Sequence, residues 1–166
     1  MRRIFIDADS CPKAAREMVL RFSERLGIKA IFVANRQIPG IKIPGIKNPG
    51  ILDEASQTMA LMEICGPEEG SADRRIAEMA EAGDLVLTRD LPLAEKLVEA
   101  GIRVIDDRGR VFTKENIKQL RSVRDFVVGL AESGLGIERT ASYGKKELNA
   151  FANSLDRELS KLIKNS

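Results

Sequence analysis

Short apolar segments alternate with amphipathic segments over the first two thirds of this chain, and this alternation limits the folds open to it. The apolar segments are rich in β-branched residues, which suit the pleated surface of a strand. The amphipathic segments carry their apolar residues at helical spacing. Strands that alternate with helices of this length form a parallel sheet between two helical layers. The predicted fold is a three-layer αβα sandwich of the α/β class, with a mostly parallel sheet of about five strands.

The expected strands are Ile4–Asp7, Ile28–Ala34, Met59–Cys65, Leu85–Thr88 and Arg103–Ile105. The expected helices are Pro12–Leu26, Ala72 to about Ala82 after a Ser71 cap, and Asp90–Ala100. Glycines Gly27 and Gly101 stop the first and third helices. These residues mark helix boundaries because a cap side chain satisfies the free N–H groups at a helix start, and a glycine favours the backbone conformation that ends a helix.

The last third of the chain is predicted to be helical. Thr113 caps a helix to about Ser133, and apolar residues from Leu148 to Leu162 form one stripe of a final helix. The polar, glycine-rich connector Gly134–Gly144 joins the two. The final helix is expected to pack back on the preceding elements, which makes residues 1–166 a single domain.

Two carboxylates follow the first apolar strand, at Asp7 and Asp9. The carboxyl ends of strands border the ligand crevice in α/β sheets, so this strand places two hard oxygen ligands together. Oxygen ligands of this type favour magnesium or manganese. The simpler interpretation is that Asp9 caps the helix beginning at Pro12 and that Asp7 only ends the strand.

The fourth strand ends in the same manner, because Asp90 follows Thr88 at a helix start. If this strand lies beside the first, across the point where strand order reverses, Asp7 and Asp90 converge on one crevice. Asp73, in the first turn of the preceding helix, is placed to join them. Capping remains the alternative for Asp90, and acidic residues are common in first helical turns.

The chain contains no histidine and only two cysteines, Cys11 and Cys65. Acid–base chemistry therefore falls to carboxylates, lysine or a metal-bound water, and zinc is not expected. Neither a Walker motif nor a dinucleotide glycine fingerprint is present, which argues against a nucleotide cofactor. The net charge of +2 and the lack of a signal peptide or long apolar run favour a cytoplasmic protein with no membrane partner.

A Pro-Gly-Ile motif repeats at Pro39, Pro44 and Pro49. Pro-Gly favours type II turns, so successive turns are expected with Lys42 and Lys47 displayed between them. The simplest interpretation is a rigid connecting loop. The alternative is a flap whose lysines approach phosphate, or whose isoleucines meet a second subunit to form a homodimer.

Several short motifs together resemble the YaiI/YqxD family of uncharacterised bacterial proteins. They are Asp7-Ala8-Asp9 with Cys11-Pro12, Val33-Ala34-Asn35, Asp73 ahead of Ile76, Gly83-Asp84-Leu85-Val86 with Thr88 and Asp90, Arg108-Gly109, Thr113 with Glu115-Asn116-Ile117, and Arg124-Asp125-Phe126. The resemblance covers nearly the whole chain and implies a PIN-like fold with strand order 3-2-1-4-5. It implies Asp7, Asp73 and Asp90 as acidic metal-site positions and Asp9 as a fourth. The Pro-Gly-Ile repeat departs from the shorter connection expected in the family.

The leading functional hypothesis is a magnesium- or manganese-dependent nuclease or phosphodiesterase that acts on RNA. Asp7, Asp73 and Asp90 would be catalytic, and the basic residues expected to contact phosphate are Arg89, Arg108, Lys114, Lys118 and Arg124. One alternative is a non-catalytic RNA-binding or regulatory protein. Another is a phosphatase of the haloacid dehalogenase type, but its second acidic motif has only Gly83-Asp84 as a candidate, at the beginning of a strand.

Overall fold

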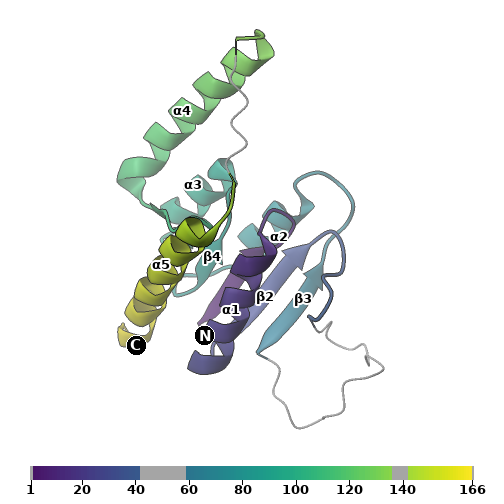
Figure 1. The fold of residues 1–166 in the computed structure, drawn as a ribbon, viewed down its shortest axis with the longest axis vertical. Helices are drawn as coiled ribbons and strands as arrows, with labels where there is room; N and C mark the ends of the chain where they lie inside the picture. The colour runs from purple at the N-terminus through teal and green to yellow at the C-terminus, as the bar shows by residue number, and fades with distance from the viewer. Residues whose placement is uncertain (1, 42–58, 136–141, 166) are drawn as a thin grey trace.

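The computed structural model describes residues 2–41, 59–135 and 142–165, and Figure 1 shows their arrangement. One six-stranded sheet has the order β3-β2-β1-β4-β5-β6. Its strands are β1 (Arg3–Asp7), β2 (Lys29–Ala34), β3 (Ala60–Ile64), β4 (Leu85–Leu87), β5 (Arg103–Ile105) and β6 (Val111–Phe112). Neighbouring strands are parallel except β5 and β6, which are antiparallel. The predicted α/β fold is thus confirmed, and the first five strands have the order that the family resemblance implied.

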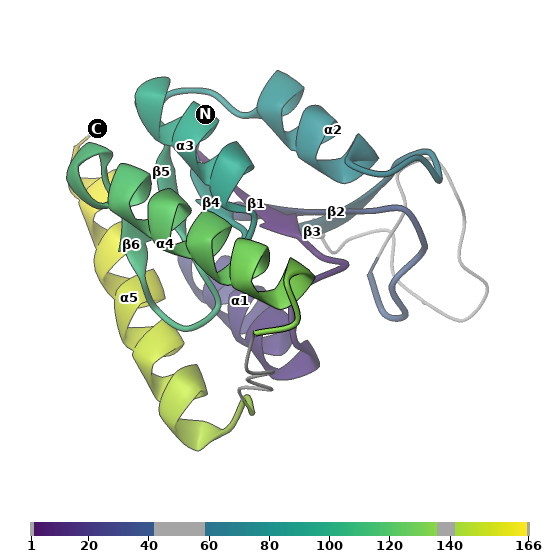
Figure 2. The ribbon, with the colours of Figure 1, turned by 90° about the horizontal axis from the view of Figure 1, so that it is seen from above.

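The described residues form five helices: α1 (Lys13–Leu26), α2 (Ser71–Met79), α3 (Leu91–Glu99), α4 (Lys114–Glu132) and α5 (Lys145–Lys164). Figure 2 shows α1 and α5 on one face and α2 and α3 on the other. Alternate strand residues supply the two cores, as in β1, where Ile4 and Ile6 face α1 and α5 while Phe5 faces α2 and α3. Both faces of the sheet are therefore buried, which explains the nearly continuous apolar strands.

The last helix packs on the sheet, as the sequence predicted. Gly109, in the turn between β5 and β6, has a φ of 86°, and a Cβ there would lie 2.4 Å from the carbonyl oxygen of Ala150. Ser154 of α5 donates a hydrogen bond to the Gly109 carbonyl at 2.5 Å. Only glycine permits this close approach of α5 to the β5–β6 turn.

Three local predictions were wrong. Strand β6 was not predicted, because two residues are too few to show a periodic pattern. Gly70, and not Ser71, is the cap of α2, since the Ser71 hydroxyl donates instead to the Gly66 carbonyl at 2.6 Å. Helix α2 also ends at Met79, before the predicted Ala82. The predicted caps Asp90 and Thr113 are confirmed.

Residues 42–58 contain most of the Pro-Gly-Ile repeat, including Lys42 and Lys47, and lie outside the described residues, as does the part of the connector at 136–141. Of the repeat, the structure describes Pro39, Gly40 and the buried Ile41. Among the helices that are described, none is both long and apolar enough to cross a bilayer.

The amino edge of the sheet depends on one buried carboxylate, Asp84, just before β4. It accepts hydrogen bonds from the backbone N–H of Arg3 at 3.0 Å and of Glu81 at 2.9 Å. Its ion pair with the Arg3 guanidinium measures 2.7 Å. This single side chain joins the beginnings of β1 and β4 and the turn before β4.

Replacement of Asp84 by alanine is expected to lower the free energy of unfolding by about 3–5 kcal/mol, because it leaves Arg3 and two N–H groups without their acceptor. Urea denaturation measures this loss. The matched control is Asp156→Ala, which removes an exposed ion pair with Arg25 and is expected to change stability by less than about 1 kcal/mol. Equal effects of the two substitutions would contradict the role given to Asp84.

Candidate functional site

The carboxyl edge of the sheet holds the acidic residues that the sequence predicted. Asp7 is the last residue of β1, which pairs with β2 on one side and β4 on the other. Its side chain is nearly buried. Burial raises the pKa of the Asp7 carboxyl, and the charges of Asp9 and Asp90 raise it further, whereas the hydroxyls of Thr88 and Ser10 lower it. Asp7 is thus a carboxylate held in a site that disfavours its charge.

Thr88 connects Asp7 to Asp90. Its hydroxyl donates to Asp7 Oδ2 at 3.1 Å and accepts the backbone N–H of Asp90, also at 3.1 Å. Because the N–H occupies a lone pair of the hydroxyl oxygen, the hydroxyl proton is directed at Asp7. Thr88 therefore fixes Oδ2 of Asp7.

Asp90 and Asp73 form a pair of carboxyl groups. Asp90 Oδ1 caps α3 by accepting the N–H of Leu93 at 2.7 Å. Asp73 lies in the first turn of α2 and makes a side-chain hydrogen bond with Asp90. Partial burial, the charges of Asp90 and Asp7, and this hydrogen bond raise the pKa of Asp73 to about 6. The structure therefore places Asp7, Asp73 and Asp90 within electrostatic reach of one another.

Asp9 has a different role from the one that capping would give it. Helix α1 has Pro12 at its cap position and no side-chain cap, so the capping interpretation of Asp9 was wrong. Asp9 Oδ2 instead accepts the backbone N–H of Asn35 at 3.0 Å, and Asp9 pairs with Arg36 at 3.8 Å. The carboxylate thereby holds the loop after β2 beside the loop after β1.

A cleft of about 290 Å³ opens next to these carboxylates. Its lining includes Asp7, Asp9, Asn35 and Asp73, and residues 67–72 close it on the side of α2. The backbone N–H groups at the beginning of α2 lie in the same wall, where a helix favours negative charge. A cation held by the carboxylates and an anion beside the helix would both suit this cleft.

Within the described ranges, no group of three or more Asp, Glu, Cys or His side chains is arranged to hold a metal ion as it stands. Asp7 accepts a hydrogen bond from Thr88, and Asp73 shares one with Asp90. Asp90 also accepts the N–H of Leu93. These side chains would have to turn toward a shared cation. Carboxylate oxygens are the ligands that magnesium and manganese prefer, so the type of donor fits such an ion.

The five basic residues predicted to contact phosphate lie on different elements. Arg89 donates to the buried Asp107 at 2.6 Å, and Arg108 lies over the ring of Tyr143 with its guanidinium 5.8 Å from the ring centre. Lys114, Lys118 and Arg124 are exposed on α4. Their action on one nucleic-acid strand stays a prediction.

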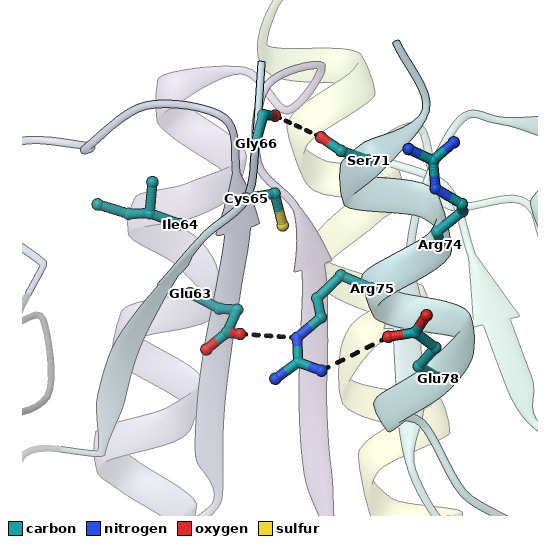
Figure 3. A pocket seen from close by; sticks show the side chains of 8 residues that line it. All are labelled: Glu63, Ile64, Cys65, Gly66, Ser71, Arg74, Arg75 and Glu78. Carbon is teal, nitrogen blue, oxygen red and sulfur yellow. Dashed lines mark hydrogen bonds and ion pairs between the residues drawn. The ribbon is translucent and has the colours of Figure 1, made fainter. Parts of the chain in front are cut away.

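A second cleft, of about 200 Å³, lies between β3 and α2 and is drawn in Figure 3. Arg75 of α2 crosses it to reach Glu63 of β3 at 2.7 Å and also pairs with Glu78 of its own helix at 3.5 Å. Burial raises the pKa of the Cys65 thiol, which keeps it protonated. Because Arg75 already neutralises both carboxylates of this cleft, the cleft suits chemistry less well than the carboxylate site.

Sequence reasoning did not assign Thr88 or Asn35 to the site. Both occur in motifs that support the family resemblance, so their positions were noticed but their contacts were not. The Thr88–Asp7 hydrogen bond joins residues 81 positions apart, and such a contact leaves no local pattern. The buried Cys11, whose thiol pKa burial raises to about 12, fits the predicted role of a core residue.

The pKa of Asp73 predicts a pH-dependent stability. The folded pKa of about 6 lies above the usual value of 3.8, so the native state binds a proton that the unfolded chain releases between these values. Stability therefore falls as pH rises through this interval. Asp73→Asn mimics the protonated form and is expected to exceed the parent in stability by about 1 kcal/mol near pH 7.5, after allowance for solvent screening, and to match it near pH 4.5.

Urea unfolding in chelator at both pH values measures this difference, with Asp156→Asn as the exposed control. A difference between parent and Asp73→Asn that does not change with pH would contradict the interaction between Asp73 and its acidic neighbours.

Comparison with known proteins gives one consistent result. The model of the uncharacterised YaiI/YqxD family matches residues 5–161. A UPF0178 protein of Treponema pallidum is 44% identical over 97% of this chain and 83% of its own length, and one of Treponema denticola is 41% identical over 98% and 94%. A UPF0178 protein of Vibrio cholerae is 38% identical over 96% of this chain and 97% of its own length. No solved structure matches this chain. The chain belongs to the YaiI/YqxD family.

Proposed function

We propose that this protein is a magnesium- or manganese-dependent nuclease or related phosphodiesterase that acts on RNA. The observation that carries the proposal is the convergence of Asp7, Asp73 and Asp90 at the carboxyl edge of the sheet, where burial and the neighbouring charges raise the pKa values of Asp7 and Asp73. Carboxylates this close repel one another, and a divalent cation among them removes the repulsion. The order of the first five strands supports a PIN-like placement as part of the same proposal.

The three aspartates would hold the cation, and Thr88 would hold Asp7 in register with Asp90. A bound cation of this kind lowers the pKa of an attacking water and neutralises the scissile phosphate. This chemistry suits a chain with no histidine, because the cation generates the nucleophile without a histidine base. Asp9 lies in the loop after β1. It would act either as a fourth ligand of the cation or by holding Asn35 against the cleft.

The proposal that the substrate is RNA rests on the positive charge of basic side chains. Arg108, Lys114, Lys118 and Arg124 would neutralise phosphates along a strand that leads to the carboxylate cleft. The ion pair with Asp107 would hold Arg89 next to Asp90. The exposed part of the Arg89 guanidinium would then contact phosphate. The proposed partner is a phosphodiester chain. The proposed reaction requires neither a nucleotide cofactor nor zinc.

Two alternatives make different demands on the same residues. A non-catalytic RNA-binding protein would keep the acidic cleft as a structural metal site. A phosphatase of the haloacid dehalogenase type needs its second acidic motif at a strand end near Asp7, but the candidate for that motif, Asp84, lies at the amino edge of the sheet, buried with Arg3. The position of Asp84 therefore favours the nuclease over the phosphatase.

The test of the proposal is cleavage of an unstructured oligoribonucleotide in manganese. Asp7→Asn, Asp73→Asn and Asp90→Asn are each expected to lose at least about 100-fold in rate, because each removes a ligand charge. Asp156→Asn, an exposed aspartate on α5 that pairs with Arg25, is the matched control and is expected to keep full activity. The thermal shift on adding manganese should disappear in Asp7→Asn.

Each other outcome selects a different conclusion. Cleavage that survives in all three variants would reveal a contaminating nuclease and overturn the site. Turnover of a small phosphomonoester, with an adduct at Asp7, would favour the phosphatase. A parent that binds manganese but cleaves neither substrate would favour the non-catalytic protein.

Thr88 supplies a sharper prediction about positioning. Thr88→Val keeps the shape of the side chain but removes the hydroxyl, and it is expected to weaken manganese binding by about 10- to 100-fold. Thr88→Ser retains the hydroxyl and should bind within a few-fold of the parent. Isothermal titration calorimetry measures the affinities, and circular dichroism checks the fold. Equal affinity in Thr88→Val and the parent would remove Thr88 from the site.

A further inference from the structure

The carboxylate cleft, the cleft of about 290 Å³ at the carboxyl edge of the sheet, is strongly acidic. Among the described residues that line it are five acidic side chains and no basic one: Asp7, Asp9, Glu68, Glu69 and Asp73. A phosphodiester chain carries a negative charge on each phosphate, so this lining repels it. A divalent cation on the aspartates offsets part of the repulsion. The rest of the positive charge must come from basic side chains at the rim of the cleft.

Arg36 lies at the rim on the side of the loops after β1 and β2. It follows Asn35, which lines the cleft, and its Nε lies 3.8 Å from Oδ1 of Asp9, which also lines it. The Arg36 side chain is 77% exposed, so this ion pair contributes little to stability. A phosphate at the rim can therefore replace Asp9 as the partner of Arg36.

Arg74 of α2 lies at the rim on the opposite side. Its Nη1 donates to the carbonyl oxygen of Glu69 at 3.5 Å and lies 3.8 Å from the position that a Cβ on Gly70 would occupy. Glu69 and Gly70 both line the carboxylate cleft. Figure 3 shows the Arg74 side chain directed toward the beginning of α2, away from the ion pairs of Arg75. In the part of the chain that the structure describes, Arg74 has no carboxylate partner.

The five basic residues expected from the sequence are arranged differently. Two of them are held by other side chains, and three lie on α4. None of the five is among the described residues that line the carboxylate cleft. They are placed to neutralise more distant phosphates, whereas Arg36 and Arg74 contact residues of the cleft lining itself.

We propose that Arg36 and Arg74 bind the two phosphates that flank the scissile phosphate, one on each side of the carboxylate cleft. This inference rests on the proposed function and specifies how the RNA strand crosses the site. With the scissile phosphate at the cation, the strand passes from the loop after β2, over the carboxyl edge of the sheet, to the beginning of α2. A guanidinium suits this role because its planar set of donors matches two oxygens of a phosphate.

Binding of a fluorescent single-stranded oligouridylate in calcium tests the two contacts, and gel electrophoresis checks that the strand stays intact. Arg36→Ala and Arg74→Ala are each expected to raise the Kd by about 3- to 10-fold and to lower the slope of log affinity against log salt by about 0.7, because each removes one phosphate contact. Arg36→Lys and Arg74→Lys keep the charge and should keep the slope. The matched control is Arg21→Ala, which removes an exposed arginine of α1 and should bind like the parent.

Cleavage in manganese tests where the two arginines act. Uridylyl-uridine carries only the scissile phosphate, whereas the same dinucleotide with a phosphate at each end also carries both flanking ones. The loss of kcat/KM in Arg36→Ala and in Arg74→Ala should be at least about fivefold larger for the substrate with the flanking phosphates. Both side chains are exposed, so circular dichroism should show unchanged folding.

The outcomes separate this inference from the proposed function. Alanine variants with the salt slope of Arg21→Ala, or with equal losses on the two dinucleotides, would overturn the inference and leave the nuclease intact. A parent that cleaves neither dinucleotide, but whose oligouridylate affinity and salt slope fall in both alanine variants, would contradict the nuclease and support the two contacts. A parent that neither binds oligouridylate nor cleaves RNA would overturn both.

Discussion

The parallel pairing of β1 with both β2 and β4 is the constraint on which the rest of this structure depends. It places β1 where the strand order reverses, so the connections after β1 and β4 leave toward opposite faces of the sheet. A crevice remains between them at the carboxyl edge. Asp7 is the last residue of a strand that is buried on both faces, so its carboxylate is fixed in position and poorly hydrated. The same pairing places Thr88 beside Asp7.

In the carboxylate cluster of Asp7, Asp73 and Asp90, the fold holds acidic groups close together although their charges repel one another. Asp90 is the cap of α3, and Asp73 lies in the first turn of α2, so two helix starts fix the backbone positions of these residues. Partial burial and the proximity of Asp90 raise the pKa of Asp73 to about 6, the range where histidine normally titrates. A group that gains its charge near neutral pH in a histidine-free protein is well suited to respond to a cation, because the cation favours the charged form.

Much of the fold could be predicted from the sequence because its signals are local. The apolar strands, the Gly27 stop and the Asp90 and Thr113 caps each act within a few residues. The site was only partly predictable: the pattern placed Asp7, Asp73 and Asp90 at one edge, but the Asp9–Asn35 and Thr88–Asp7 hydrogen bonds depend on chain segments that meet only after folding. Strand β6 was missed because its pairing with β5, and not its own sequence, makes it a strand.

The contact of α5 with the β5–β6 turn has a consequence for biosynthesis. One face of the sheet is covered jointly by α1, which is made early, and by α5, whose buried Phe151, Leu155 and Leu159 leave the ribosome after every strand. Until then the nascent chain exposes apolar strand surface over the region that α5 will cover, and such surface promotes aggregation. A cell that makes this protein must therefore shield an incomplete sheet until α5 emerges.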